Sequence, residues 1–312
     1  MTPRSMLSAV ALVALLASPG AARQNDARAF ATPEQAARAL AAAARADGMD
    51  ALLAIFGPTG RELFDTSDPG TSQRNRQTFA VAFAEEWRVE DLGVGRKELV
   101  IGHESWPFPV PLVKTARGWV FDAAAGKNEI LNRRIGRNEL ATIRACLAYV
   151  KAQNAYAKTG HDGKPAGAYA RRISSDPGTQ NGLYWDVKRG EPRSPLGDLV
   201  AEAAADGDPR DTSHPGRTPF HGYYFRIVEA QGFAAAGGAK QYIVEGNMTG
   251  GFALVAWPAK YDATGVMTFI VNQDGVVHEK DLGPETTTRA LSVTRYDPDS
   301  TWARVDRQAP SR

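Results

Sequence analysis

The chain has 312 residues, of which 43% are hydrophobic and 23% are charged, so the composition of an ordinary globular protein excludes a disordered or fibrous chain. Its 37 Lys and Arg residues against 35 Asp and Glu give a net charge of +2, too small to hold a nucleic acid through phosphate contacts. The one cysteine, Cys146, can form neither an internal disulfide nor a cysteine-based zinc cluster. We therefore expect a fold stabilised by packing and no nucleic-acid partner.

The N-terminus has the pattern of an export signal. Residues 1–22 begin with one cation, Arg4, continue as an apolar run from Met6 to Ala17, and end in small residues up to Ala22. The run is shorter than the ~20 residues that a membrane-spanning helix needs. We expect a signal peptide over 1–22 that is cleaved, a periplasmic or secreted protein, and no stable membrane insertion after cleavage. An uncleaved anchor and a hydrophobic N-terminal helix are the alternatives.

Helices open the expected N-terminal half, residues 23–132. Thr32, Pro33 and Gln35 supply an N-cap hydroxyl, a proline at the first helical position and a side chain that can reach back to the cap, which predicts a helix start. A second helix should cover residues 49–56.

An aromatic stripe and three extended runs complete this half. Phe79, Phe83 and Trp87 are spaced four apart, which predicts a third helix whose aromatic face packs in a core, with a ligand-facing wall as the alternative. Prolines within residues 107–111 favour an edge strand or a polyproline-like segment. Helices followed by a small curved antiparallel sheet are similar to the NTF2-like cone. The extended runs are residues 99–101, 108–113 and 119–121.

A long helix should open the second half, residues 133–306, and residues 307–312 should form a tail. Asn138 is the expected N-cap, and the helix should end near Ala157. The 158–220 segment that follows is too long to lack secondary structure, so short helices are expected at 166–173 and 196–205. The expected apolar face of the long helix is Leu140, Ile143, Leu147 and Val150, with Cys146, Tyr149 and Tyr156 on its flank.

Beyond His221 the apolar residues alternate, which predicts the strands of an antiparallel meander. Residues 272–275, Asn-Gln-Asp-Gly, have the composition of a tight hairpin turn. The fold class is therefore α+β, and a long helix packed on a meander resembles the globular part of type IV pilins and pseudopilins. The expected strands are residues 223–227, 242–244, 252–257, 266–271 and 276–280.

Six phrases of the sequence carry a family resemblance: 106–112 (WPFPVPL), 133–140 (RRIGRNEL), 182–185 (GLYW), 221–226 (HGYYFR), 248–258 (MTGGFALVAWP) and 265–275 (GVMTFIVNQDG). Together they resemble the family of exported bacterial proteins that share the domain of unknown function 2950, over roughly Phe30 to Val305. The resemblance implies export and supports the α+β fold, and it carries no activity, cofactor or site residue.

Signatures of catalysis and of metal binding are not found in the sequence. It contains no G-x-S-x-G elbow and no H-x-x-x-H or H-E-x-x-H pair among its five histidines. The glycine pairs at 237–238 and 250–251 lie between predicted strands, where hairpin geometry explains them. We expect no catalytic residue, no cofactor and no metal, and we expect Cys146 to be a buried, inert thiol.

Two groups of residues are candidate sites. Arg133, Arg134 and Arg137 lie where the halves join, beside Glu129 and Glu139, and guanidinium groups are suited to bridging carboxylates there; anion binding is the second interpretation. The other group concentrates aromatic surface around the 158–220 segment, as carbohydrate or peptide sites do, with loop anchoring as the alternative. It comprises Tyr184, Trp185, His221, Tyr223 and Tyr224.

The leading function hypothesis is a non-enzymatic periplasmic or cell-envelope protein that binds an envelope protein or a small ligand. An envelope hydrolase with dispersed Asp, Glu and His residues is one alternative, and a pilin-like assembly subunit is another. A pocket with convergent carboxylates or histidines would favour the hydrolase, an apolar groove would favour binding, and an exposed sheet edge would favour assembly.

Overall fold

The computed structural model describes residues 27–46, 49–64, 69–187, 190–191, 193–200 and 219–306. The expected signal peptide and C-terminal tail lie outside these residues. Among the described helices, none is both long and apolar enough to cross a membrane. The chain divides into two compact units, Met1–Ile130 and Leu131–Arg312, and the boundary falls within helix α5 (Ala123–Tyr156).

The first unit begins with helices, as the sequence predicts. Thr32 caps the first of them, since its hydroxyl accepts the N–H of Gln35 at 3.2 Å. The predicted bounds of the second helix are also confirmed. The elements are α1 (Pro33–Arg45), α2 (Met49–Phe56), a 3₁₀ turn (Pro58–Gly60), α3 (Arg61–Phe64) and α4 (Pro69–Glu85).

The aromatic stripe extends past the end of its helix. Phe79 and Phe83 lie on α4, with ring centroids 5.9 Å apart, but the expectation that Trp87 is helical is wrong. Trp87 opens strand β1 (Trp87–Gly93), which pairs with β2 (Arg96–Ile101) as an antiparallel hairpin. The Trp87 ring still stacks on Phe83 at 5.0 Å, so the stripe packs in the core although its last member lies on a strand.

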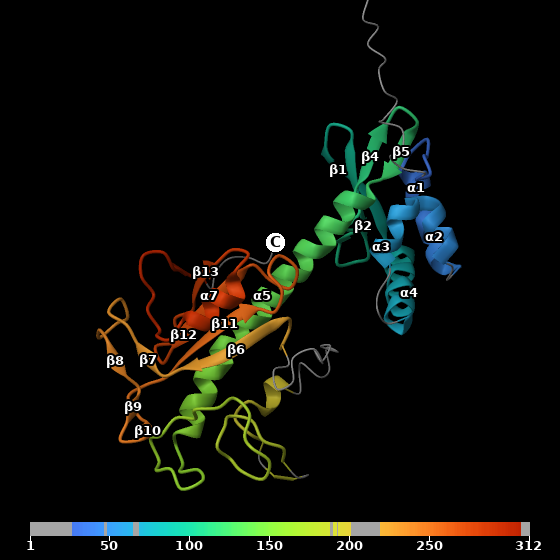
Figure 1. The fold of residues 1–312 in the computed structure, drawn as a ribbon. Coiled ribbons are helices and arrows are strands. Elements are labelled where there is room, and N and C mark those ends of the chain that lie inside the picture. The colour runs from blue at the N-terminus through green and yellow to red at the C-terminus, as the bar shows by residue number, and fades with distance from the viewer. Residues whose placement is uncertain are drawn as a thin grey trace, which may run out of the picture. The chain divides into compact units, whose positions relative to one another are not determined.

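A small antiparallel sheet completes the first unit (Figure 1). Its order is β1-β2-β4-β5, and β3 pairs with β2 beside β4. The proline-rich segment contributes only β3 at an edge, and residues 108–111 form no strand, as missing N–H donors dictate. The remaining strands are β3 (Trp106–Pro107), β4 (Leu112–Thr115) and β5 (Gly118–Phe121).

Helix α5 is 34 residues long and begins 15 residues before the expected N-cap. Asp122 caps it, because its carboxylate accepts the N–H of Ala125 at 3.0 Å. Asn138 instead lies inside the helix, and its side-chain amide donates to the carbonyl of Thr264 at 2.8 Å. The expectation that Asn138 is a cap is therefore wrong, whereas the predicted C-terminal end is confirmed.

A five-stranded antiparallel sheet forms the centre of the second unit, with the order β14-β13-β12-β11-β6. The predicted meander and its hairpin turn are confirmed, since the N–H of Gly275 donates to Asn272 at 3.0 Å. Residues 243–244 belong instead to a separate two-stranded ribbon inserted between β6 and β11. The strands of the sheet are β6 (Tyr223–Val228), β11 (Ala253–Pro258), β12 (Met267–Asn272), β13 (His278–Asp281) and β14 (Ala303–Arg304).

Two ribbons, including the one that contains residues 243–244, and one helix complete the second unit. The ribbons pair β7 (Ala230–Gln231) with β8 (Lys240–Gln241) and β9 (Ile243–Val244) with β10 (Asn247–Met248), and helix α7 (Thr286–Ser292) lies between β13 and β14.

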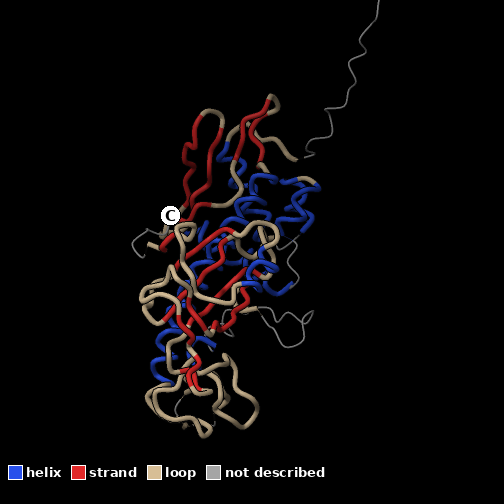
Figure 2. The backbone as a smooth tube through the Cα atoms, turned by 60° about the vertical axis from the view of Figure 1, so that its left-hand side comes forward, coloured by secondary structure: helices blue, strands red, loops and turns tan. Residues whose placement is uncertain are grey.

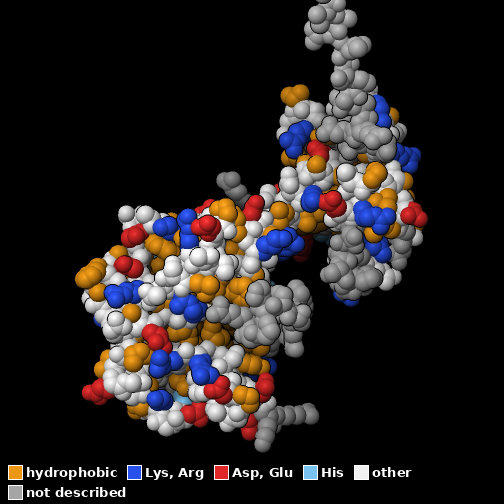
Figure 3. All heavy atoms as spheres, in the orientation of Figure 1, with side chains coloured by type: hydrophobic (Ala, Val, Ile, Leu, Met, Phe, Trp, Pro, Cys, Tyr) orange, Lys and Arg blue, Asp and Glu red, His pale blue; other side chains and the backbone are white. Residues whose placement is uncertain are grey.

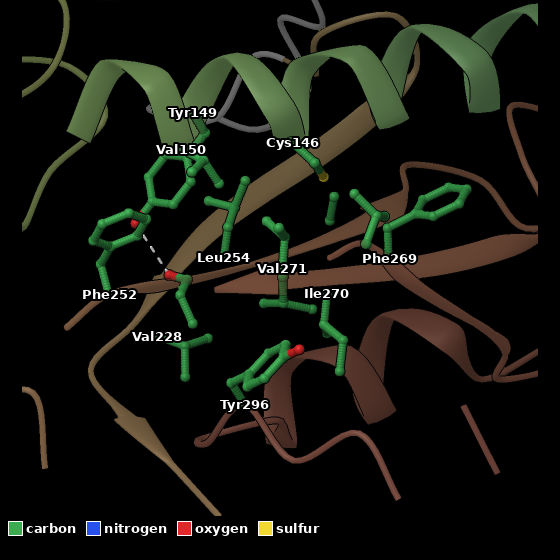
Figure 4. Close-up of a cluster of buried hydrophobic side chains, with 14 of the residues drawn as sticks. Cys146, Tyr149, Val150, Val228, Phe252, Leu254, Phe269, Ile270, Val271 and Tyr296 are labelled. Atoms are coloured by element: carbon green, nitrogen blue, oxygen red, sulfur yellow. Dashed lines mark hydrogen bonds between the residues drawn. The ribbon is translucent and has the colours of Figure 1, made fainter. Parts of the chain in front are cut away.

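The sheet is covered on both faces, by α5 and by α7. Figure 4 shows Cys146 and Tyr149 of α5 directed at the sheet, while Ile270 and Tyr296 lie on the opposite side, near α7. Alternation along each strand sends successive side chains to these two faces. Tyr149 also donates from its hydroxyl to the carbonyl of Ala253 at 3.2 Å.

The segment after α5 is loop rather than helix (Figure 2). The expected helix at 166–173 is absent, because Gln153 of α5 holds the backbone of Ala170 extended: its side-chain amide donates to the Ala170 carbonyl at 2.8 Å and accepts the Ala170 N–H at 2.9 Å. Residues 197–200 are helical, and the remainder of the second expected helix, 201–205, lies outside the described residues.

Cys146 is fully buried, and burial raises the pKa of its thiol from 9.0 to about 12, which lowers the thiolate fraction at neutral pH about a thousandfold. We predict that a thiol reagent labels the native protein at least ~100-fold more slowly than the urea-unfolded protein. Absorbance of the released chromophore over time measures both rates, and equally fast labelling of the native protein would show that the thiol is reactive.

Candidate functional site

Two of the candidate aromatic residues anchor the loop beyond α5. The ring of Trp185 lies 5.8 Å from that of His161, which itself stacks on Tyr156 with centroids 4.1 Å apart. The N–H of Tyr184 donates to the carbonyl of Ile173 at 2.8 Å, and both Tyr184 and Trp185 pack partly buried against the core. These contacts hold the loop against the end of the helix.

The other three candidates lie at the start of β6. Tyr223 is fully buried, and its hydroxyl donates to the carbonyl of Met267 at 2.9 Å. Tyr224 lies 5.9 Å from Trp257, ring to ring. His221 has a positive φ of 46° in the turn that precedes the strand.

The positions that these two groups contact along helix α5 give the distance between them. Tyr223 approaches Glu139, whereas His161 and Trp185 gather around Tyr156, 17 residues further along the helix. At 1.5 Å per residue this is a rise of about 25 Å. The structure therefore places the five aromatic candidates in two groups that do not share one binding surface.

Glu139 fastens α5 to the sheet. One carboxylate oxygen, Oε1, accepts the main-chain N–H groups of Val266 and Met267 at 2.9 and 3.0 Å, and the Tyr223 hydroxyl lies 3.5 Å from the same oxygen. Its neighbour Asn138 binds the Thr264 carbonyl. The sequence pattern that indicates this role is an acidic side chain on the sheet-facing side of an amphipathic helix.

A second carboxylate lies on the sheet face that α5 covers. Glu279 on β13 lies opposite Phe269 of β12 on the face that α5 covers. Burial raises the pKa of Glu279, and the negative charge of Glu139 raises it further. Burial also raises the pKa of Tyr223, with Glu139 again adding to the effect. The structure thus brings together a carboxylate pair that the sequence analysis did not identify.

A groove, the α5–β13 groove, lies between α5 and the β13–β14 edge of the sheet, and its lining combines apolar side chains with Arg304 and Asp306. Its volume is about 490 Å³. Ile143 lies one turn after Glu139 on α5, and Val277 lies two residues before Glu279 on the same face of the sheet. The lining residues are Ile143, Leu147, Val276, Val277, Arg304, Val305 and Asp306.

The helical wall of the α5–β13 groove is the stripe that the sequence predicts as the core face of the helix. Ile143 and Leu147 are only partly buried, and Leu140 of the same stripe is 51% exposed. The face of α5 that packs on the sheet is rotated about the helix axis from this stripe. It contains Cys146 and the buried residues one and two turns from Cys146 along the helix. Val150 of the predicted stripe lies in the core, and Ile143 and Leu147 pack against it, so the prediction is confirmed for these residues and is wrong for Leu140.

A second groove, of about 440 Å³, runs along α4 in the first unit. Among the residues that the structure describes, those that line it all come from this one helix. They are Arg74, Gln77, Thr78, Val81, Ala82 and Glu85.

The predicted arginine cluster lies on α5. Arg134 and Arg137 are exposed and Arg133 is partly buried. Within the described part of the chain, no ion pair joins Arg134 or Arg137 to a carboxylate. On the faces seen in Figure 3, Lys and Arg side chains are mixed with Asp and Glu rather than gathered in one patch. The same residues contain no group of three or more His, Cys, Asp or Glu side chains that could hold a metal ion.

Because Arg134 and Arg137 are solvated, we predict that Arg134→Ala and Arg137→Ala each change the free energy of unfolding by no more than ~0.5 kcal/mol. Urea unfolding of both variants measures this difference. A loss of ~3 kcal/mol or more in either variant would instead indicate a buried ion pair at that position.

The raised pKa of Glu279 predicts a pH-dependent stability. A carboxyl whose pKa is higher in the folded state than in the unfolded state is harder to ionise when the protein is folded. The free energy of unfolding therefore falls as the pH rises above ~4.3, the usual pKa of a glutamate. We predict that Glu279→Gln is more stable than the wild type at pH ~7, by no more than ~0.5 kcal/mol because partial exposure screens the charge. The difference should vanish below pH ~4.

Urea unfolding of both proteins at the two pH values checks this, with Glu285→Gln as a control at an exposed carboxylate. A wild type that is the more stable of the two at neutral pH would contradict it.

The family model described as "Protein of unknown function (DUF2950)" matches residues 27–305, which is most of the chain. No curated protein and no solved structure is significantly similar to this chain. The match includes both compact units and the α5–β13 groove. The chain belongs to the DUF2950 family.

Proposed function

We propose that this protein is a non-enzymatic binding protein of the periplasm or cell envelope, and that it holds a small ligand with an apolar body in the α5–β13 groove. The observation that carries the proposal is a space of about 490 Å³ in which Ile143 and Leu147 of α5 lie across from Val276, Val277 and Val305, with Arg304 and Asp306 also in its lining. Ligand sites in proteins are typically clefts of ~300–1,000 Å³ with mostly apolar walls. Removing ligand carbons from water on these side chains would supply the binding free energy.

Export belongs to the same proposal and is supported by the cation, apolar run and small residues of positions 1–22. Mass spectrometry of the periplasmic fraction would test it, with a mature N-terminus at or near Arg23 expected. An intact Met1 on the major soluble species would contradict export with cleavage.

An envelope hydrolase is the second candidate, and the observation that favours it is that the charge of Glu139 raises the pKa of a second carboxyl, that of Glu279. However, one oxygen of Glu139 already accepts two main-chain hydrogen bonds, and the Tyr223 hydroxyl donates to Met267. These polar atoms support the fold, so a binding function accounts for more of the geometry.

A pilin-like assembly subunit is the third candidate, because a long helix covers an antiparallel meander whose outer strands are β6 and β14. We also propose an NTF2-like arrangement for the first unit and a pilin-like arrangement for the second. Gel filtration across a concentration series tests the assembly function, which predicts growth of the apparent mass.

The binding function predicts that Leu147→Gln weakens the binding of Nile red, a neutral apolar dye, about tenfold, because a polar side chain replaces part of the apolar wall. Leu291→Gln is the matched control, since Leu291 is 43% exposed on α7 and does not line the groove. Dye fluorescence gives both affinities, and urea midpoints show whether the variants fold. Wild-type affinity in a folded Leu147→Gln variant would place the ligand elsewhere.

A further inference from the structure

The turn of the β1–β2 hairpin presents an apolar side chain to solvent. Val94 is fully exposed and lies between Gly93 and Gly95, whose φ angles of 114° and 68° belong to conformations that glycine adopts readily. The two glycines therefore form the turn, and its geometry does not require valine. Turn positions usually hold Gly, Asn, Asp or Ser, whereas Val is typical of strands. Val94 thus departs from the local pattern without contributing to the core of the unit.

A β-bulge exposes a second apolar side chain beside the turn. Asp91 pairs with Lys97 and Gly93 pairs with Arg96, so Leu92 has no residue opposite it in β2. An extra residue of this kind bends its strand and changes the direction of its side chain. Leu92 is exposed and, like Val94, lies outside the core. Single exposed apolar residues need no explanation, but two at the hairpin tip, residues 91–97, indicate an interaction surface.

Cations outnumber acids around the hairpin tip. The β4–β5 turn lies at the same end of the sheet (Figure 1), because the N–H of Lys114 donates to the carbonyl of Gly95 at 2.8 Å. Residues 91–97 and 114–117 contain four cations and one acid, Asp91. The carboxylate of Asp91 accepts from Nζ of Lys97 at 2.8 Å. The other three cations are all exposed and leave this end of the sheet with a local positive charge. They are Arg96, Lys114 and Arg117.

We propose that the hairpin tip attaches the protein reversibly to an anionic lipid surface, with Leu92 and Val94 among the lipids and the three cations against lipid phosphates. Charge complementarity favours an anionic partner, and guanidinium and ammonium groups are suited to phosphate. Lipids rearrange around a convex tip, whereas a protein partner would need a matching cavity. The contact is peripheral, so it differs from the stable insertion of a membrane-spanning helix. It does not depend on the α5–β13 groove.

The proposed contact needs both kinds of side chain. Two small apolar residues remove little surface from water, so alone they bind a bilayer weakly. Each Lys or Arg near an anionic surface strengthens binding about fivefold. Salt screens this attraction, and the binding should therefore weaken as ionic strength rises.

Vesicle co-sedimentation tests the lipid class. The chain from Arg23 to Arg312 is used, so that the apolar run of residues 6–17 cannot enter the bilayer itself. At ~0.1 M salt it should bind phosphatidylglycerol vesicles at least ~10-fold more tightly than phosphatidylcholine vesicles, and ~1 M salt should abolish the difference. Equal binding to both lipids would overturn the proposal. No binding to phosphatidylglycerol would also overturn it, in favour of an acidic protein partner.

Val94→Asp tests the apolar contact. It should lower the affinity for phosphatidylglycerol vesicles at least ~10-fold, because a carboxylate replaces an apolar group, while the turn accepts Asp without strain. Val81→Asp is the matched control: Val81 is exposed on α4, whose Ala82 lies beside Gly102 at the opposite end of β2. Its affinity should be unchanged. Equal losses in the two variants would overturn the assignment to the hairpin tip.

The cations are tested by Arg96→Gln combined with Lys114→Gln. At about fivefold for each charge, this double variant should bind phosphatidylglycerol vesicles about 25-fold more weakly. Arg45→Gln combined with Arg61→Gln removes the same charge from exposed positions on α1 and α3 and should bind like the wild type. Wild-type binding by the first double variant would overturn the phosphate contacts.

Entry of the tip into the bilayer has a readout independent of affinity. Val94→Cys can be labelled with a nitrobenzoxadiazole dye, whose emission moves to shorter wavelength in apolar surroundings, while the buried Cys146 is expected to react slowly. Phosphatidylglycerol vesicles should shift the emission of the dye at position 94 but not that of the dye on Val81→Cys. Bound protein without a shift at position 94 would overturn the insertion of the tip.

Discussion

The contact of Glu139 with the start of β12 determines how α5 lies on the C-terminal sheet. Its carboxylate accepts the N–H groups of Val266 and Met267, so it fixes both the position of the helix and its rotation about its own axis. With Glu139 facing the sheet, Ile143 comes one turn later beside β13. The groove depends on this rotation, because a helix turned further would bury the apolar stripe and close the space.

The core face of α5 is more polar than a typical buried helical stripe. It contains Tyr149 and Gln153 as well as the apolar residues, and buried polar groups need partners. Gln153 finds them on the backbone of Ala170 and on the Tyr149 hydroxyl, and Tyr149 donates to Ala253. One helix therefore orders the loop beyond its own end, supports the sheet and forms a wall of the groove.

The net charge of the chain gives little information about the groove. A balance of +2 over 312 residues argues against polyanion binding but averages over sites of opposite sign. What a ligand in the groove meets is the local arrangement, in which Ile143, Leu147 and Val277 lie beside one cation, Arg304, and one carboxylate, Asp306.

The sequence by itself determined the family, the α+β class, the first two helices, the C-terminal end of α5 and the meander. These follow from caps, periodicity and turn residues, which act between neighbours in the chain. The sequence did not determine where α5 begins, because both Asp122 and Asn138 are suitable caps. In the structure the Asn138 side chain binds the carbonyl of Thr264, which leaves Asp122 as the cap.

The groove, and the nearness of Glu139 to Glu279, were decided by tertiary structure alone. Periodicity showed that Ile143 and Leu147 share an apolar face but could not show what covers it. Glu139 and Glu279 are 140 residues apart in the chain, and the sheet brings them together through pairings that no local pattern specifies.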